Sequence, residues 1–322
     1  MAVISDGAWH GTAQLRFSCA ADGCTRHQGG TTAPLRVQRP FGRADGRCEL
    51  PLLHTAGGLV GGDRLSITAQ LGPGSRVLLT SVAAQKVYGS IGRSRLSPAG
   101  AWARQELSFR VEAGADLEWL PQDLVLYANG LYEQRTRVWL ASGASWLGAE
   151  VVRLGRTAAQ ETLGEGRWRS LLEIERAGPN GEGGHWELVD RLELGGEALR
   201  QGHGMAAEPV FGSLVWAAPQ PLAADPLAKL LEACRADRGD LPGELACGAL
   251  EQGLIARYRG PSSQAARTWF TRLWARIRAA NGLAPPERPR VWPFQEEPFA
   301  GLAADGQMGG DQPPAPARVG AG

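Results

Sequence analysis

The fold class follows from residues 65–80, whose sequence is LSITAQLGPGSRVLLT. Apolar and polar residues alternate over positions 65–71, which is the pattern of a strand with one buried face. The stretch 72–75, rich in glycine and proline, is typical of a turn, and it leads into the apolar run 77–80. Residues 65–80 therefore predict two strands joined by a tight glycine turn.

The same pattern of strand, glycine turn and strand recurs along the chain. Residues 107–120 repeat it around Gly114, and residues 138–148 repeat it around Gly143, at unequal separations. Residues 168–176 and 186–194 add a further pair around a glycine-rich loop. These patterns predict a mainly β protein of stacked β-hairpins or sheets, in a β-helix-like or multi-layer β architecture, and not a strict solenoid of fixed period.

Two helices are predicted late in the chain, near 226–238 and 263–280. We expect Asp225 to cap the first and Pro226 to occupy its first turn. The second starts near Ser262 or Ser263 and carries its apolar stripe on one face. Residues 1–302 are predicted to form a single β-rich domain, and residues 303–322 a disordered tail of glycine, proline and alanine.

Composition excludes several classes of function. The 322 residues include 34 Lys and Arg against 33 Asp and Glu, a formal charge of +1. This near-equality of positive and negative charge argues against nucleic acid and against an anionic membrane surface as partners. No apolar run is long enough to span a bilayer, and the first residues lack the pattern of a secretion signal, so we expect a soluble, cytoplasmic protein. The five cysteines and five histidines lack the local spacing of a metal motif.

Two short segments hold the candidate chemistry. Residues 52–63, LLHTAGGLVGGD, contain two glycine pairs but neither the GK[ST] nor the following helix of a phosphate loop. Asp63 is either a ligand or a partner of turn amides. Residues 117–123, LEWLPQD, place Glu118 on a strand, where it is either on the surface or buried and paired.

Glu150 and Glu161 flank residues 154–156, LGR, and several arginines lie nearby in sequence. An ion-pair network explains this cluster as well as a functional site does.

Together these segments resemble the UreD family of urease accessory proteins, called UreH in some systems. The matching blocks are residues 53–65, 79–88, 117–123, 154–156 with Glu161, and 289–292. The family often carries glutamate where Asp123 stands and glycine where Gln160 stands.

The resemblance implies an accessory protein, not an enzyme. It implies a β-rich scaffold that binds UreF, which docks the GTPase UreG on the urease apoprotein, above all on its nickel-bearing subunit UreC. It also implies that Ni²⁺ passes through transiently, coupled to GTP hydrolysis by UreG, and that no cofactor is held tightly. Scattered carboxylates suit such transit, because tight thiolate or histidine sites would release nickel slowly.

On this basis we expect a wet passage between stacked sheets. Its expected lining is Asp63, Glu118, Glu150, Glu161 and His54. Replacing Glu118 or Asp63 by the amide should then leave folding intact and lower nickel delivery.

Two further groups of side chains are candidates. The second family-like block supplies a passage lining or a partner face through Thr80, Ser81, Gln85, Lys86 and Tyr88. The second helix carries Trp269, Phe270 and Trp274, which form either a surface for UreF or a core against the β-body.

Two other classes of function stay open. One is a carbohydrate-active β-rich hydrolase in which Glu118 and Asp123 act as paired acid and base. The other is a tethering module that never contacts metal.

Overall fold

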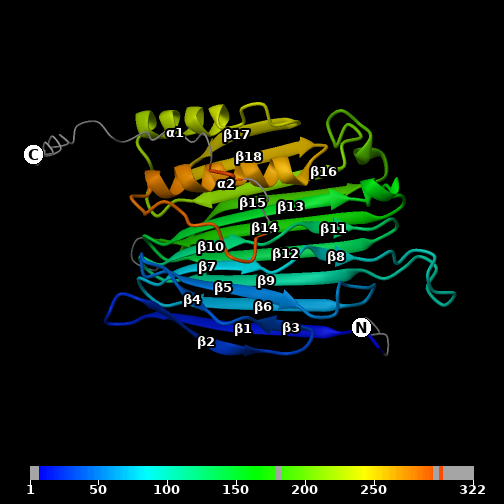
Figure 1. Cartoon of the computed structure of the whole chain (residues 1–322), viewed down its shortest axis with the longest axis horizontal. Coiled ribbons are helices and arrows are strands. Elements are labelled where there is room, and N and C mark those ends of the chain that lie inside the picture. The colour runs from blue at the N-terminus through cyan, green and yellow to red at the C-terminus, as the bar shows by residue number, and fades with distance from the viewer. Residues whose placement is uncertain (1–6, 179–182, 293–296, 300–322) are drawn as a thin grey trace, which may run out of the picture.

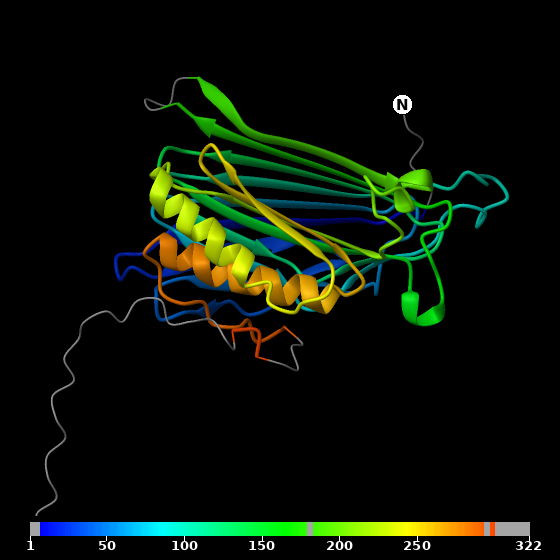
Figure 2. The same cartoon turned by 90° about the horizontal axis from the view of Figure 1, so that it is seen from above.

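The structure is a computed structural model that describes residues 7–178, 183–292 and 297–299. Two large β-sheets lie face to face, and two helices cover the outer face of one of them (Figures 1 and 2). The mainly β class is confirmed. The predicted tail 303–322 lies outside the described residues.

The seven-stranded sheet has a parallel centre and an antiparallel strand at each edge. In spatial order it consists of β15 (Gly184–Gly195), β14 (Arg167–Ala177), β12 (Leu131–Leu140), β9 (Ala103–Val111), β6 (Arg64–Leu71), β1 (His10–Cys19) and β2 (Thr25–Thr31).

The eleven-stranded sheet is parallel from β5 to β13 and antiparallel beyond. Its main path is β17 (Glu244–Leu250), β18 (Gly253–Gly260), β16 (Val210–Ala217), β13 (Ser145–Leu154), β10 (Asp116–Leu120), β7 (Arg76–Ser81), β5 (Cys48–His54) and β3 (Leu35–Val37). Three short strands join it, namely β4 (Phe41–Gly42), β8 (Gln85–Val87) and β11 (Leu124–Leu126).

The glycine turns connect strands of opposite sheets, so the predicted hairpins at these turns are wrong. Gly74 lies between β6 and β7, Gly114 between β9 and β10, and Gly143 between β12 and β13. All three have φ near +70°, at 68°, 67° and 73°, which glycine adopts without strain. The chain therefore coils through the two sheets in a β-helix-like manner. Alternation shows that a strand has a buried face but not whether its neighbour in sequence pairs edge to edge or packs face to face.

The hairpin predicted from residues 168–176 and 186–194 is present as the antiparallel pair β14 and β15.

Helices α1 (Ala224–Ala236) and α2 (Ser263–Ala280) match the predicted helices within two residues. Ser262 caps α2 by accepting a hydrogen bond from the Ala265 amide at 3.2 Å. Asp225 does not cap α1, because Ala223 takes the extended conformation of the capping position and Asp225 falls in the first turn. There it still faces the positive end of the helix dipole.

The molecule has two apolar cores. One fills the space between the sheets, and the other lies between the eleven-stranded sheet and the helices. Strand β10 is buried along its whole length because both of its faces are covered, as in the buried strands of other layered folds. Within the described part of the chain, neither helix has the length and apolar character needed to cross a membrane.

Candidate functional site

A cavity of about 70 Å³ lies between the two sheets, and we call it the intersheet cavity. Its volume is large enough to hold water. Apolar side chains of both sheets form part of its wall. Its polar lining consists of His54, Ser81, Gln85, Gln105, Gln122, Tyr132, Gln134 and Glu150.

Glu150 of β13 lines this cavity and two smaller ones. A second cavity between the sheets, of about 30 Å³, has Thr136, Ser170 and Ser213 in its wall. A cavity under α2, also of about 30 Å³, has Arg267 and Trp292 in its wall. Glu150 therefore lines three water-sized spaces, and its carboxylate points into the space between the sheets.

The surroundings of Glu150 favour its protonated form. Its carboxylate accepts hydrogen bonds from Gln134 Nε2 at 2.9 Å and from Ser170 Oγ at 3.3 Å. Burial raises the pKa of Glu150 to about 7, and Asp190 adds to the shift while Arg257 opposes it. Near neutral pH this carboxyl group can therefore take up or release a proton.

His54 ends strand β5 and lines the intersheet cavity. Burial lowers the pKa of its ring, and the charge of Asp63 opposes that shift. Its Nε2 atom is buried and has no hydrogen-bond partner in the described part of the chain. A neutral imidazole in this position is able to act as a weak ligand.

The donor set suits a divalent cation in passage more than one held in place. It offers one carboxylate, one imidazole and several amide oxygens, which are ligand types used for divalent metals. Among the described residues, no group of three or more His, Cys, Asp and Glu side chains is arranged to hold a metal ion.

Asp63 lies at the start of β6 and binds backbone amides. It accepts hydrogen bonds from the Trp9 and Val60 amides, each at 2.9 Å, with a different carboxylate oxygen for each. It does not line the intersheet cavity. An asparagine would leave one of these amides without its acceptor, so the expectation that the amide variant spares folding is revised.

Glu161 is also in a loop contact and not in the cavity wall. It accepts a hydrogen bond from the Ala128 amide at 2.6 Å and forms an ion pair with Arg156. The Arg156 hydrogen bond lowers the pKa of Glu161.

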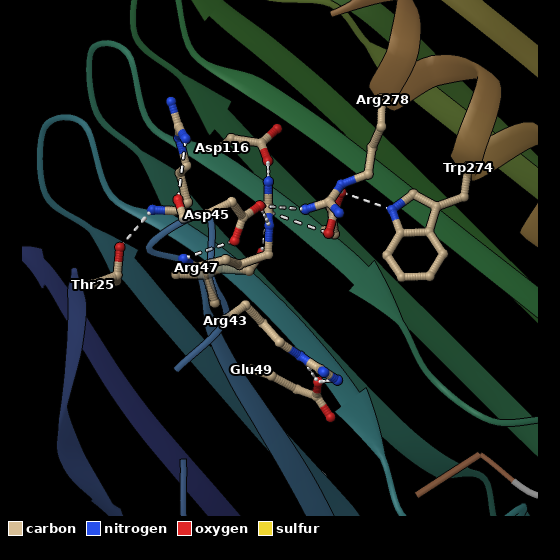
Figure 3. A network of polar contacts seen from close by, with 11 residues as sticks. Thr25, Arg43, Asp45, Arg47, Glu49, Asp116, Trp274 and Arg278 are labelled. Atoms are coloured by element: carbon tan, nitrogen blue, oxygen red, sulfur yellow. Dashed lines mark hydrogen bonds and ion pairs between the residues drawn. The ribbon is translucent and has the colours of Figure 1, made fainter. Parts of the chain in front are cut away.

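Glu118 of β10 is in a buried ion-pair network under α2 (Figure 3). Its side chain is 2% exposed. The carboxylate pairs with Arg278 Nε at 2.9 Å and with Arg47 Nη1 at 3.3 Å, and it accepts a hydrogen bond from Trp274 Nε1 at 2.7 Å. The network ties α2 to the eleven-stranded sheet.

Two guanidinium groups face three carboxylates in this network (Figure 3). Arg47 also pairs with Asp116 at 2.6 Å and lies 3.5 Å from Asp45, which Arg278 contacts at 2.9 Å. Burial raises the pKa of Glu118, and the charges of Arg47 and Arg278 oppose that shift. Glu118 is therefore engaged in ion pairs and, contrary to expectation, does not line the intersheet cavity.

The hydrolase alternative receives no support from this geometry. Glu118 is closed off from solvent, and Asp123 lies 3.5 Å from Arg267. Neither side chain lines the three cavities described above.

The residues of the second family-like block have different positions. Ser81 lines the intersheet cavity, together with Gln85, and accepts a hydrogen bond from the Gln122 amide at 2.8 Å. Thr80 is buried and donates to the Leu120 carbonyl at 2.6 Å while accepting from Trp292 Nε1 at 2.8 Å.

The other two members of that block do not line the intersheet cavity. Lys86 is exposed. Tyr88 packs edge to face on Tyr127, with ring centres 5.0 Å apart.

The three aromatic residues of α2 are not a docking surface. Trp269, Phe270 and Trp274 are all buried in the core between α2 and the eleven-stranded sheet. Trp269 Nε1 donates to the Cys234 carbonyl at 2.8 Å and so links α2 to α1. Helix α2 buries more aromatic side chains than a single apolar stripe would hold, because it contacts the eleven-stranded sheet and α1 at the same time.

Sequence reasoning missed most of the polar cavity lining. Gln105 and Gln134 point inward, although glutamine on a strand ordinarily faces water. Gln122 lies between β10 and β11, and its side chain accepts a hydrogen bond from Arg267 of α2 at 2.6 Å. The alternation along β12 could have indicated Gln134, because Tyr132, Gln134 and Thr136 lie on the same face of the strand as the buried Val138.

Comparisons with known proteins agree with the family resemblance of the sequence blocks. A family model described as UreD urease accessory protein matches residues 10–293. A protein of Synechococcus sp. (strain CC9902) named urease accessory protein UreD is 60% identical over 291 residues, which are 90% of this chain and 93% of that protein.

Two further relatives carry the same name. One from Parasynechococcus marenigrum (strain WH8102) is 59% identical over 293 residues, covering 91% of this chain and 93% of that protein. One from Prochlorococcus marinus (strain MIT 9313) is 59% identical over 301 residues, covering 92% and 94%.

Proposed function

The chain belongs to the UreD family of urease accessory proteins, and from this premise we propose that it helps deliver nickel to the urease active site. In this proposal it joins UreF and UreG on the urease apoprotein, contacts the nickel-bearing subunit UreC, and acts in the cytoplasm without catalysing a reaction itself. Delivery is coupled to GTP hydrolysis by UreG. Ni²⁺ is cargo that passes through, and no cofactor stays bound.

The observation that carries the proposal is the position of the Glu150 carboxylate between the two sheets, where Glu150 lines both intersheet cavities. A hydrated cation that enters between two sheets needs polar groups to replace part of its water shell. Glu150, His54 and the inward glutamines are the groups that supply this, so the proposed passage runs along the intersheet cavity. Asp63, Glu118 and Glu161 are left out of it because each has a structural partner.

The chemistry of the lining favours rapid release. Each additional 1.4 kcal/mol of affinity slows dissociation about tenfold at a fixed association rate, so a carrier benefits from weak sites. A carboxyl group with a pKa of about 7 supports this behaviour, because protonation removes the charge that attracts the cation.

The test compares urease activation in cells that carry Glu150→Gln with activation in cells that carry the wild-type chain. We expect the variant to capture UreF, UreG and urease subunits as the wild-type chain does, and to give less active urease. The matched control is Glu112→Gln, a carboxylate in the turn between β9 and β10 that pairs with an exposed Arg110. Full activation by Glu150→Gln with normal assembly would instead support a tethering module that never contacts metal.

A further inference from the structure

The seven-stranded sheet ends at β15 and the eleven-stranded sheet ends at β17, and these two edge strands do not lie opposite each other. Asp190 of β15 pairs with Arg257 of β18 at 2.5 Å, and the ring of Trp168 on β14 lies 5.3 Å from that of Phe211 on β16. Strand β15 therefore lies opposite β18. Strand β17 extends the eleven-stranded sheet by one strand more, and no described strand of the other sheet lies opposite it.

An open groove of about 690 Å³ occupies this step, and Figure 2 shows the hairpin of β14 and β15 standing apart from β17 and β18. Leu192 and Leu194 of β15 form part of one wall. Leu245 and Ala246 of β17 form part of the other. The groove is therefore largely apolar and bounded by strands on two sides.

Strand β15 is a 12-residue edge that pairs only with β14 in the described part of the chain. It exposes two large apolar side chains, Trp186 at 58% and Val189 at 45%. Free edges are usually protected by charge, proline or a covering segment, because their unpaired amides and carbonyls attract other strands. A long edge with exposed apolar side chains is the arrangement that accepts an added strand.

The charges in the groove leave one cation without a partner. Arg259 pairs with Glu244, Arg257 with Asp190, and Glu193 with Arg169. Arg238 follows α1 and lines the groove, and its guanidinium group has no hydrogen bond or ion pair among the described residues. An occupant that carries a carboxylate near Arg238 would complete the pairing.

We propose that β15 accepts one extended strand from a urease maturation partner, which pairs along β15 and lies opposite β17. This inference rests on the proposed function, and it assigns the partner's contact to a part of the surface. The added strand turns small or apolar side chains toward Ala246 and places a carboxylate beside Arg238.

The test is hydrogen–deuterium exchange of the full chain, alone and mixed with purified UreF, UreG or urease apoprotein. We expect one partner to slow exchange of the amides of residues 184–195 about tenfold or more. Ala246→Trp fills the groove and should abolish this slowing and weaken binding about tenfold, which corresponds to about 1.4 kcal/mol. Ala249→Trp places the same side chain on the opposite face of the same strand, and it should behave as the wild-type chain does.

Gly248→Leu provides a second blocking variant if Ala246→Trp fails to fold, because a Cβ atom at Gly248 meets no atom within 4 Å. Partner binding and urease activation without any slowing along β15 would overturn the inference and leave the proposed function intact. Failure of all three partners to bind would overturn both. Slowing that appears in the chain alone and disappears on dilution would identify a second copy as the occupant and overturn the inference.

Discussion

Glu118 and Glu150 come from neighbouring strands of one sheet, yet their surroundings give them different tasks. Glu118 on β10 faces the helices and pairs with Arg47 and Arg278. Glu150 on β13 lines cavities and has hydrogen bonds from an amide and a hydroxyl group. The first holds an element in place, and the second is the carboxylate on which the proposed passage depends.

The raised pKa of Glu150 predicts a pH-dependent cost in stability. Its ordinary pKa of 4.5 applies when the chain is unfolded, and the value of about 7 applies when it is folded. Between these values the unfolded chain loses the proton that the folded chain keeps, so stability falls as pH rises from 4.5 to 7 and then stays level. Glu150→Gln removes this cost.

We therefore expect Glu150→Gln to gain up to about 3 kcal/mol over the wild-type chain between pH 4.5 and pH 8. Urea unfolding at both pH values measures the difference. The same difference at both values would show that the carboxyl group titrates normally.

Removing the charge of Glu118 should act on stability. Glu118→Gln deprives Arg47 and Arg278 of a shared partner in a closed space, and we expect a loss of about 3 kcal/mol in the free energy of unfolding. The exposed pair of Arg110 and Glu112 gives the comparison, because Glu112→Gln should cost less than about 1 kcal/mol. Equal urea midpoints for the two variants would contradict the structural role of Glu118.

The sequence indicates the roles of some single residues but not of others. His54 and Glu150 could be predicted as site residues because a histidine and a carboxylate stand within apolar strands. The structural role of Glu118 could not, since its partners Arg47 and Arg278 lie far away along the chain and meet it only after the sheet and α2 have packed together.

Glycines allow the sharp turns that connect the strands, because they adopt positive φ without strain. At Gly155, which follows β13, φ is +97° and an added Cβ would lie 2.4 Å from the Glu161 carbonyl oxygen. At Gly114, φ is +67° and an added Cβ meets nothing within 4 Å. The first position is restricted by both conformation and space, and the second by conformation alone.

Alanine at these two positions should therefore have different effects. Gly114→Ala should cost about 1 kcal/mol, the usual penalty of the left-handed region. Gly155→Ala should cost clearly more, because the loop that carries Glu161 must shift as well. Thermal unfolding of both variants checks the order, and a smaller effect at Gly155 would show that this loop moves freely.

Strands and helices were predictable from local patterns, but the connections between strands were not. Alternation and glycine turns locate β6 and β7, and the apolar stripe locates α2. Whether two successive strands form a hairpin or pass between sheets depends on the faces that both must bury, and this is decided by the whole set of strands. The aromatic side chains of α2 show the same limit, since only the assembled layers reveal that they are buried.

In the whole molecule, the helix layer and the space between the sheets have different roles. The helices and the ion-pair network close one face of the eleven-stranded sheet, and the space between the sheets keeps a polar lining around Glu150. The step at β15 and β17 leaves a free strand edge. The proposed function uses this separation, because it places partners outside and the cation inside.

The proposed function requires that nickel passes Glu150 on its way to urease. The most direct measurement is the nickel content of urease, by elemental mass spectrometry, after maturation with purified UreF, UreG, GTP and either the wild-type chain or Glu150→Gln. We predict that the variant assembles the same complex and loads nickel at least about tenfold more slowly, a barrier increase of about 1.4 kcal/mol. Equal loading rates from complexes of equal composition would contradict the claim.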